Sequence, residues 1–105
     1  MLLPQTLSPT GRANFWQMRT ALAAVPGTPP AVVQACRQAV AAAAAPYGMV
    51  QVRATSAGTV SRLRKGGVAA PIAVRVQYAR LTGVEIRQAR ITCRLDASGS
   101  VVALK

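Results

Sequence analysis

The sequence has no histidine and only two acidic side chains, Glu85 and Asp96. The missing histidine excludes the commonest general base, the triads built on it and histidine metal sites. Two cysteines without a histidine do not complete an ordinary zinc site. Each carboxylate lies beside an expected turn, where local structure explains it. Since the chain also lacks a glycine-rich nucleotide loop, we expect no enzyme, no metal and no cofactor.

Long apolar runs are also missing. No run approaches the ~18 residues of a membrane-spanning helix. The apolar block from Ala21 to Val25 is shorter than the ~7–15 residues of a signal-peptide core. The sequence therefore predicts neither a membrane span nor a secretory signal within the residues given.

Aromatic residues make up only 4% of the 105 residues, although 51% of the chain is apolar. This length predicts one domain of modest stability. Its core must be thin and built from Val, Ile, Leu and Ala. The bias toward Ala, Arg and Val is typical of a GC-rich bacterium or its phage.

The charge balance is the strongest global feature. The chain carries 13 Lys and Arg against two acidic residues, a net charge of +11. Most of these cations lie after position 50. A field of this sign attracts polyanions, anionic lipid headgroups or an acidic protein.

The first part of the chain predicts an arm. Residues 1–11 contain two prolines and a glycine, and we expect them to lack structure of their own. Residues 12–25 show helical spacing and hold Phe15 and Trp16, which would close the core or dock on another protein. We divide the chain into an arm with a short aromatic helix, residues 1–28, and a basic α+β domain, residues 29–105.

The main helix is predicted to start after Thr28, a plausible N-cap, and to continue through Ala45. Pro46 and Gly48 would end it. Its apolar stripe consists of Val33, Cys36, Val40 and Ala43 or Ala44.

After Gly48 the apolar spacing becomes two, which predicts strands. The segments are 49–55, 59–65, 72–79, 84–95 and 100–104, with turns at 56–58, 66–67, 82–83 and 96–99. The 59–65 segment is weak and suits a sheet edge. In 84–95 the apolar residues change parity, so we expect a bulge near Arg87 to Ala89 that unites them on one face.

The expected fold is α+β: one main helix packed on a four- or five-stranded antiparallel meander, preceded by a short N-terminal helix. This arrangement resembles cystatin-like architectures in element order only. No protease-inhibitor motif accompanies it, and a shared fold does not establish function.

Cys36 and Cys93 lie on the apolar faces of the main helix and of the long strand. If helix packs on sheet, the two side chains meet, and we expect a disulfide. Two buried thiols are the alternative. A disulfide favours a periplasmic or secreted protein whose signal was removed or whose start is misassigned; a cytoplasmic location is the alternative.

The other parity of the strands predicts a basic binding face that contains Arg53, Arg75, Arg90 and Arg94. Three further cations are expected to flank it and complete the binding face: Arg62, Arg64 and Lys65. We expect a binding or accessory protein that docks on an acidic protein partner, with Phe15 and Trp16 as apolar anchors. Binding of nucleic-acid phosphates is one alternative, but stacking aromatics are missing from this face. Attachment to an anionic envelope or membrane surface is the other. The sequence indicates no small-molecule substrate.

Overall fold

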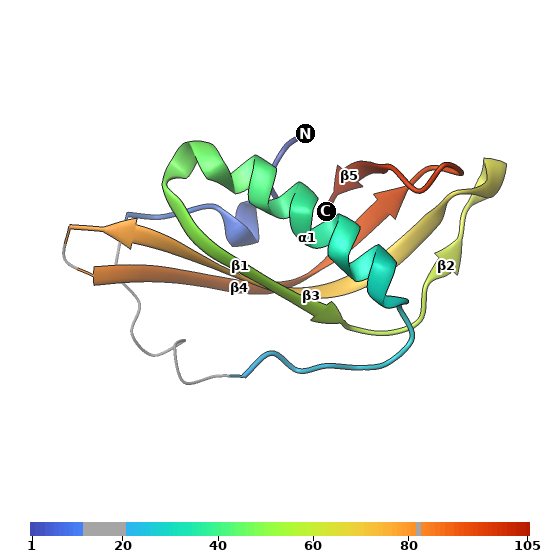
Figure 1. The fold of residues 1–105 in the computed structure, drawn as a ribbon, viewed down its shortest axis with the longest axis horizontal. Helices are drawn as coiled ribbons and strands as arrows, with labels where there is room; N and C mark the ends of the chain where they lie inside the picture. Colours follow the sequence, from blue (N-terminus) through green and yellow to red (C-terminus); the bar gives the residue numbers. More distant parts are fainter. Residues whose placement is uncertain (12–20, 82) are drawn as a thin grey trace.

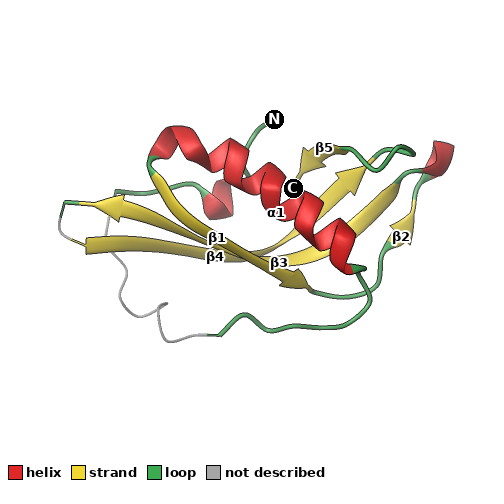
Figure 2. Cartoon of the chain, in the orientation of Figure 1, coloured by secondary structure: helices red, strands yellow, loops and turns green. Residues whose placement is uncertain are grey.

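A computed structural model describes residues 1–11, 21–81 and 83–105. One α-helix packs on one face of a five-stranded antiparallel sheet (Figure 1). The helix crosses the sheet obliquely as a separate layer, and the rest of the described chain consists of short 3₁₀ segments, turns and loops (Figure 2). The predicted α+β class, with one main helix on an antiparallel sheet, is confirmed.

The main helix, α1, spans Pro30–Ala44 and continues into a 3₁₀ turn, η3, at Ala45–Tyr47. Its buried residues are Cys36, Val40 and Ala44, spaced by four so that they share one stripe. Gly48 ends the turn with a φ of 83°, a conformation that suits glycine. No described helix is long and apolar enough to cross a membrane.

Thr28 does not cap this helix as predicted, because Pro29 occupies the N-cap position. The buried Thr28 hydroxyl instead donates to the carbonyl of Gly58 at 2.9 Å and lies 3.5 Å from that of Pro71. These contacts tie the start of the helix to the sheet.

The strands are β1 (Met49–Ser56), β2 (Ser61–Arg62), β3 (Val68–Arg80), β4 (Gly83–Leu95) and β5 (Val101–Leu104). They are ordered β1-β3-β4-β5, and β2 pairs with β3. Because β4 follows β3 along its whole length, β1 and β2 share the opposite side of β3. The predicted turn at 56–58 therefore does not reverse the chain; it interrupts an edge strand.

The long hairpin of β3 and β4 has an unbroken register, from Val68 opposite Leu95 to Arg80 opposite Gly83. The predicted bulge near Arg87 to Ala89 is wrong. Ile91 and Leu95 thus face α1, whereas Ile86 faces the other side of the sheet and is still fully buried. Both sides of this hairpin are covered, so no bulge is needed to bury both apolar sets.

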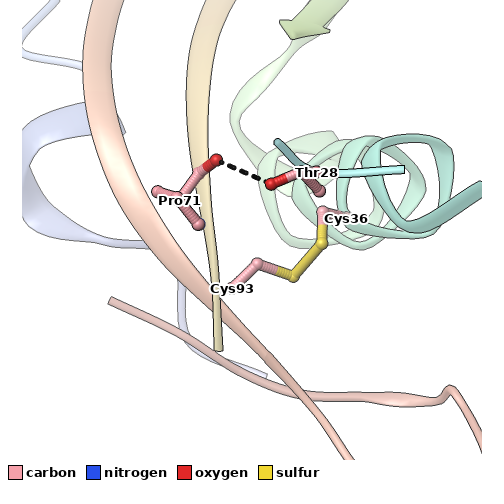
Figure 3. The surroundings of a disulfide bond; sticks show 4 residues. All are labelled: Thr28, Cys36, Pro71 and Cys93. Carbon is pink, nitrogen blue, oxygen red and sulfur yellow. Dashed lines mark hydrogen bonds between the residues drawn. A yellow bond between two sulfur atoms is a disulfide. The ribbon is translucent and has the colours of Figure 1, made fainter. Parts of the chain in front are cut away.

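The predicted disulfide between Cys36 and Cys93 is present (Figure 3). Both residues are fully buried, their Cα atoms are 6.1 Å apart, and the bond closes a separation of 57 residues. It joins α1 to β4 in the middle of the core. The disulfide indicates an oxidising environment outside the cytoplasm.

The N-terminal residues are part of the fold, contrary to prediction. A 3₁₀ turn, η1 (Gln5–Leu7), packs against β4 on the helix side of the sheet (Figure 1). Leu7 is fully buried in the core. Its carbonyl accepts a hydrogen bond of 2.7 Å from the hydroxyl of Tyr78. Burial raises the pKa of Tyr78 to about 12, which keeps that hydroxyl a donor.

The chain then changes sides. Residues 21–25 pass along the face of the sheet opposite α1 (Figure 1). The amide of Val25 donates to the carbonyl of Ser56 at 2.8 Å, and Val25 forms an isolated parallel bridge with Ala57. Of the helix predicted over 12–25, residues 12–20 lie outside the described residues, and residues 21–24 are not helical.

Candidate functional site

Four arginines share the side of the sheet that faces away from α1, and we call them the basic face: Arg53, Arg75, Arg90 and Arg94. The register places Arg53 directly opposite Arg75, Arg90 opposite Ala73, and Arg94 opposite Ala69. Arg53, Arg90 and Arg94 are exposed, whereas Arg75 is half-buried. Strand pairing therefore gathers cations that are far apart in the sequence.

The other three predicted members lie elsewhere. Arg62 pairs with Val68, whose parity belongs to the helix side of the sheet. Arg64 and Lys65 form a 3₁₀ turn (Arg64–Gly66) beyond the strand end, and Lys65 has a φ of 65°. These three residues are exposed but lie at the end of the sheet. Phe15 and Trp16 lie outside the described residues.

Two arginines of the basic face are held by neighbouring groups. Arg75 donates through Nε to the side-chain oxygen of Gln88 at 2.8 Å, and Arg90 donates through Nη2 to the carbonyl of Ala57 at 2.7 Å. Within the described chain, Arg53 and Arg94 make no side-chain hydrogen bond. The face thus combines two oriented guanidinium groups with two that are free to engage a partner.

The centre of this face is apolar and partly covered. Ala73 and Ile86 are buried, and Leu22 and Ala23 of the segment 21–25 lie near Ala73. A pocket of about 260 Å³ remains here, lined by Leu22, Ala23, Ala73, Gln88, Ala89 and Arg90.

Both acidic side chains of the sequence are already engaged within the chain. Glu85 is fully buried and accepts hydrogen bonds from the amide and hydroxyl of Thr10, the amide of Gly11 and Nε of Arg80. Burial alone would raise the pKa of Glu85, but these donors outweigh it and hold the pKa below its ordinary value.

Asp96 is engaged by its own turn. One of its carboxylate oxygens accepts hydrogen bonds from the hydroxyl and amide of Ser98 and from the amide of Ser100. The Ser98 hydroxyl is the main reason that the pKa of Asp96 is lowered. Neither carboxylate is therefore available to neutralise the basic face.

This site also contains residues that were not predicted: Gln88, Ile86 and the segment 21–25. The strand parity of 84–95 contained the signal for Ile86, because an unbroken strand puts Ile86 on the arginine side. The prediction of a bulge moved Ile86 to the helix side, so it was not counted among the residues of this face. The coverage by residues 21–25 depends on long-range packing and left no local pattern in the sequence.

No metal centre is evident in the part of the chain that the structure describes, which holds no group of three or more His, Cys, Asp and Glu. Comparisons of the chain with protein-family models, curated proteins and solved structures find no match.

Proposed function

We propose that this chain is a non-enzymatic binding or accessory protein, periplasmic or secreted, that docks through its basic face on an acidic surface of a protein partner. It would act as a subunit of a larger assembly. One observation carries the proposal: the face has four arginines, while the two acidic side chains of the chain are bound elsewhere. Carboxylates from outside the chain would neutralise the face.

The geometry favours carboxylates over nucleic-acid bases. Neighbouring strands are about 5 Å apart and alternate residues about 7 Å apart, so the arginines form a close array. Guanidinium forks bind carboxylates in two-point contacts. Single-stranded nucleic acids require aromatic platforms, and Tyr78 is buried on the helix side. Among the described residues of the basic face there is no aromatic side chain.

The disulfide supports a location outside the cytoplasm. Nucleic acid is mostly intracellular and is therefore a less suitable partner there. Phe15 and Trp16 are proposed as apolar anchors for the partner. Aromatic residues are enriched in interface cores, which makes them suitable for this role. A native pull-down with identification of the retained chains would name the partner, and Phe15→Ala with Trp16→Ala should release it.

A matched pair of double variants tests the proposal. Arg53→Gln with Arg94→Gln removes two exposed charges from the basic face; Arg37→Gln with Lys105→Gln removes two charges elsewhere. We expect the first variant to bind poly-L-glutamate about three- to tenfold more weakly, as for two exposed ion pairs. The second should lose about twofold or less, because only long-range attraction falls.

Equal losses in the two variants would contradict the proposal, because binding would then follow net charge alone. Single-stranded DNA and vesicles containing anionic lipid serve as parallel probes at the same ionic strength. Binding of DNA or vesicles that is tighter than binding of poly-L-glutamate, and equally sensitive to Arg53 and Arg94, would favour one of the other two functions.

A further inference from the structure

The outer edge of the sheet at β1 is open along part of its length. Among the described residues, β1 pairs with β3 on one side and has no strand on the other. Just beyond β1, the amide of Ala57 donates to the carbonyl of Pro71 and continues the same register. Backbone groups alternate in direction along an antiparallel strand. Val52 and Ala54, which have the other parity, therefore turn their amide and carbonyl groups outward.

The described chain uses this edge only at its end. The carbonyl of Ser56 turns outward with the same parity and accepts a hydrogen bond of 2.8 Å from the amide of Val25. The residues before Val25 leave the edge, since Leu22 and Ala23 line a pocket with Ala73 of β3. Within the described chain, the part of the edge that precedes Ser56 thus stays free for another strand.

A second pocket of about 260 Å³ lies beside this open edge, between the start of α1 and the end of β1. Its apolar lining comes from Pro30, Val33 and Ala54. Ala54 shares its parity with Val52, which is buried on the helix side of the sheet. A cavity of about 150 Å³ holds a benzene molecule. This pocket is therefore large enough for an aliphatic side chain.

The opposite face of the same edge carries a cation. Arg53 lies between Val52 and Ala54 in the sequence, so it points to the side away from α1, where it is exposed. A strand added at this edge would place every second side chain beside Arg53 and the others on the side of the pocket. An acidic residue suits the first face and an aliphatic residue suits the second.

We propose that the open edge of β1 binds an extended segment of the partner, in which acidic and aliphatic residues alternate, as an added strand. The backbone groups of Val52 and Ala54 would bond the segment. Arg53 would hold its acidic side chains, and the pocket would take an aliphatic one. This inference rests on the proposed function, since it names the form in which an acidic partner is held.

A second copy of the chain suits this edge less well. Pairing of two β1 edges would bring the Arg53 side chains of both copies onto one face, beside the Arg75 that already lies opposite each of them. Like charges on neighbouring strands destabilise a sheet. The net charge of +11 adds a general repulsion between copies.

A blocked eight-residue peptide that alternates glutamate and valine is a direct probe. Its control has the same composition, with all glutamates before all valines, so that a strand no longer separates the two kinds of side chain. We expect the alternating peptide to bind the whole chain at least about fivefold more tightly than the control, because only it matches both faces. Equal affinities would overturn the proposal.

Two arginine variants locate the bound peptide. Arg53→Gln should weaken binding of the alternating peptide about two- to fivefold, as for one exposed ion pair. Arg94→Gln removes the same charge from the same face but lies two strands away, so its loss should stay below about twofold. Equal losses in the two variants would place the peptide elsewhere and contradict the proposal.

The backbone contacts have their own test. Only alternate amides of an added strand face its neighbour. Of two peptides N-methylated at all valines or at all glutamates, one should therefore lose binding about tenfold or more and the other should keep it. Ala54→Pro removes an outward donor at an edge position that tolerates proline, and should weaken binding about five- to tenfold. Full binding by both methylated peptides, or by Ala54→Pro, would contradict the added strand.

Hydrogen exchange in the wild-type chain keeps the test valid if Ala54→Pro does not fold. The amides of Val52 and Ala54 should exchange rapidly in the free chain and slowly with the alternating peptide, while the amide of Val102 on β5 stays unchanged. The proposal is wrong if the peptide gives no protection. It is also wrong if these amides are already protected in the free chain, because the chain itself or a second copy would then occupy the edge.

Failure of this edge can be told apart from failure of the proposed function. If the alternating peptide binds no better than its control while poly-L-glutamate binding still depends on Arg53 and Arg94, only the added strand is wrong. If poly-L-glutamate binding is also insensitive to those two arginines, the proposed function fails as well.

Discussion

Glu85 connects two distant parts of the chain. Its carboxylate receives donors from residues 10 and 11 of the N-terminal arm and from Arg80 of its own hairpin. Replacing this carboxylate weakens the hydrogen bonds of several partly buried donors from Thr10, Gly11 and Arg80. A single side chain therefore ties residues 10 and 11 of the arm to the sheet.

Glu85→Gln should lower the free energy of unfolding at neutral pH by about 1–3 kcal/mol, the cost of weakening charged hydrogen bonds. The folded-state pKa of Glu85 is lowered. Its stabilisation is therefore complete above the ordinary carboxyl pKa of about 4.3 and is lost as the pH falls through the folded value. Denaturant unfolding between neutral and acidic pH measures this.

The wild type should lose stability on acidification, and Glu85→Gln should lose less over the same range. Asp96→Asn, in an exposed turn, is the control and should retain the part of the pH dependence that comes from Glu85. An identical pH profile for the wild type and Glu85→Gln would show that the contacts to residues 10 and 11 contribute nothing.

At the scale of elements, the N-terminal arm is a structural part of the domain. Leu7 is fully buried in the main core, whereas Leu2 is 88% exposed. Leu7→Ala should cost about 2–5 kcal/mol of unfolding free energy, as for other buried leucines. Leu2→Ala makes the same chemical change and should stay within about 0.5 kcal/mol. Equal stabilities would show that the arm does not pack on the sheet in solution.

The disulfide joins α1 to β4 across 57 residues. In the chain-entropy view, such a link contributes about 4 kcal/mol. The double variant Cys36→Ala with Cys93→Ala, or reduction of the wild type, should therefore lower the denaturant midpoint strongly. An intact mass that shows two free thiols, or a midpoint unaffected by reductant, would contradict the link.

The local patterns of the sequence predicted the elements well, and failed where distant segments decide. Spacings of four placed Cys36 and Val40 on one helix face, and the alternation of β3 was clear. The bulge was wrong because the pattern of 84–95 was interpreted as if only one side of the sheet could be buried. Leu22 and Ala23 lie near Ala73 and Gln88 on the other side, and nothing in the local composition of residues 21–25 indicates it.

The site was predicted less completely than the fold. Strand parity correctly placed Arg53, Arg75, Arg90 and Arg94 together on one face. Arg62 was expected to flank this face but lies on the helix side of the sheet. Strand β2 is only two residues long, and its pairing partner cannot be inferred from alternation. The role of Gln88 depends on cross-strand register, which a single sequence does not specify.

At the scale of the whole molecule, the basic face is one part of a strongly basic surface, since Arg62 and Arg87 lie on the helix side of the sheet. The helix covers one side of the sheet, and the arginines of the basic face lie on the other. With a net charge of +11, two copies of the chain repel each other. A partner of opposite charge is therefore expected in preference to self-association.

The most direct test of the account is a map of where poly-L-glutamate binds the wild-type chain, obtained from backbone amide shifts in NMR. We expect the largest shifts at positions flanking and including the basic face on β1, β3 and β4, among them Gln51, Arg53, Gln77 and Arg94. The exposed helix positions Gln38 and Ala42 should be unaffected. Shifts that centre on α1, or that spread evenly over the surface, would contradict a docking role for the arginine side of the sheet.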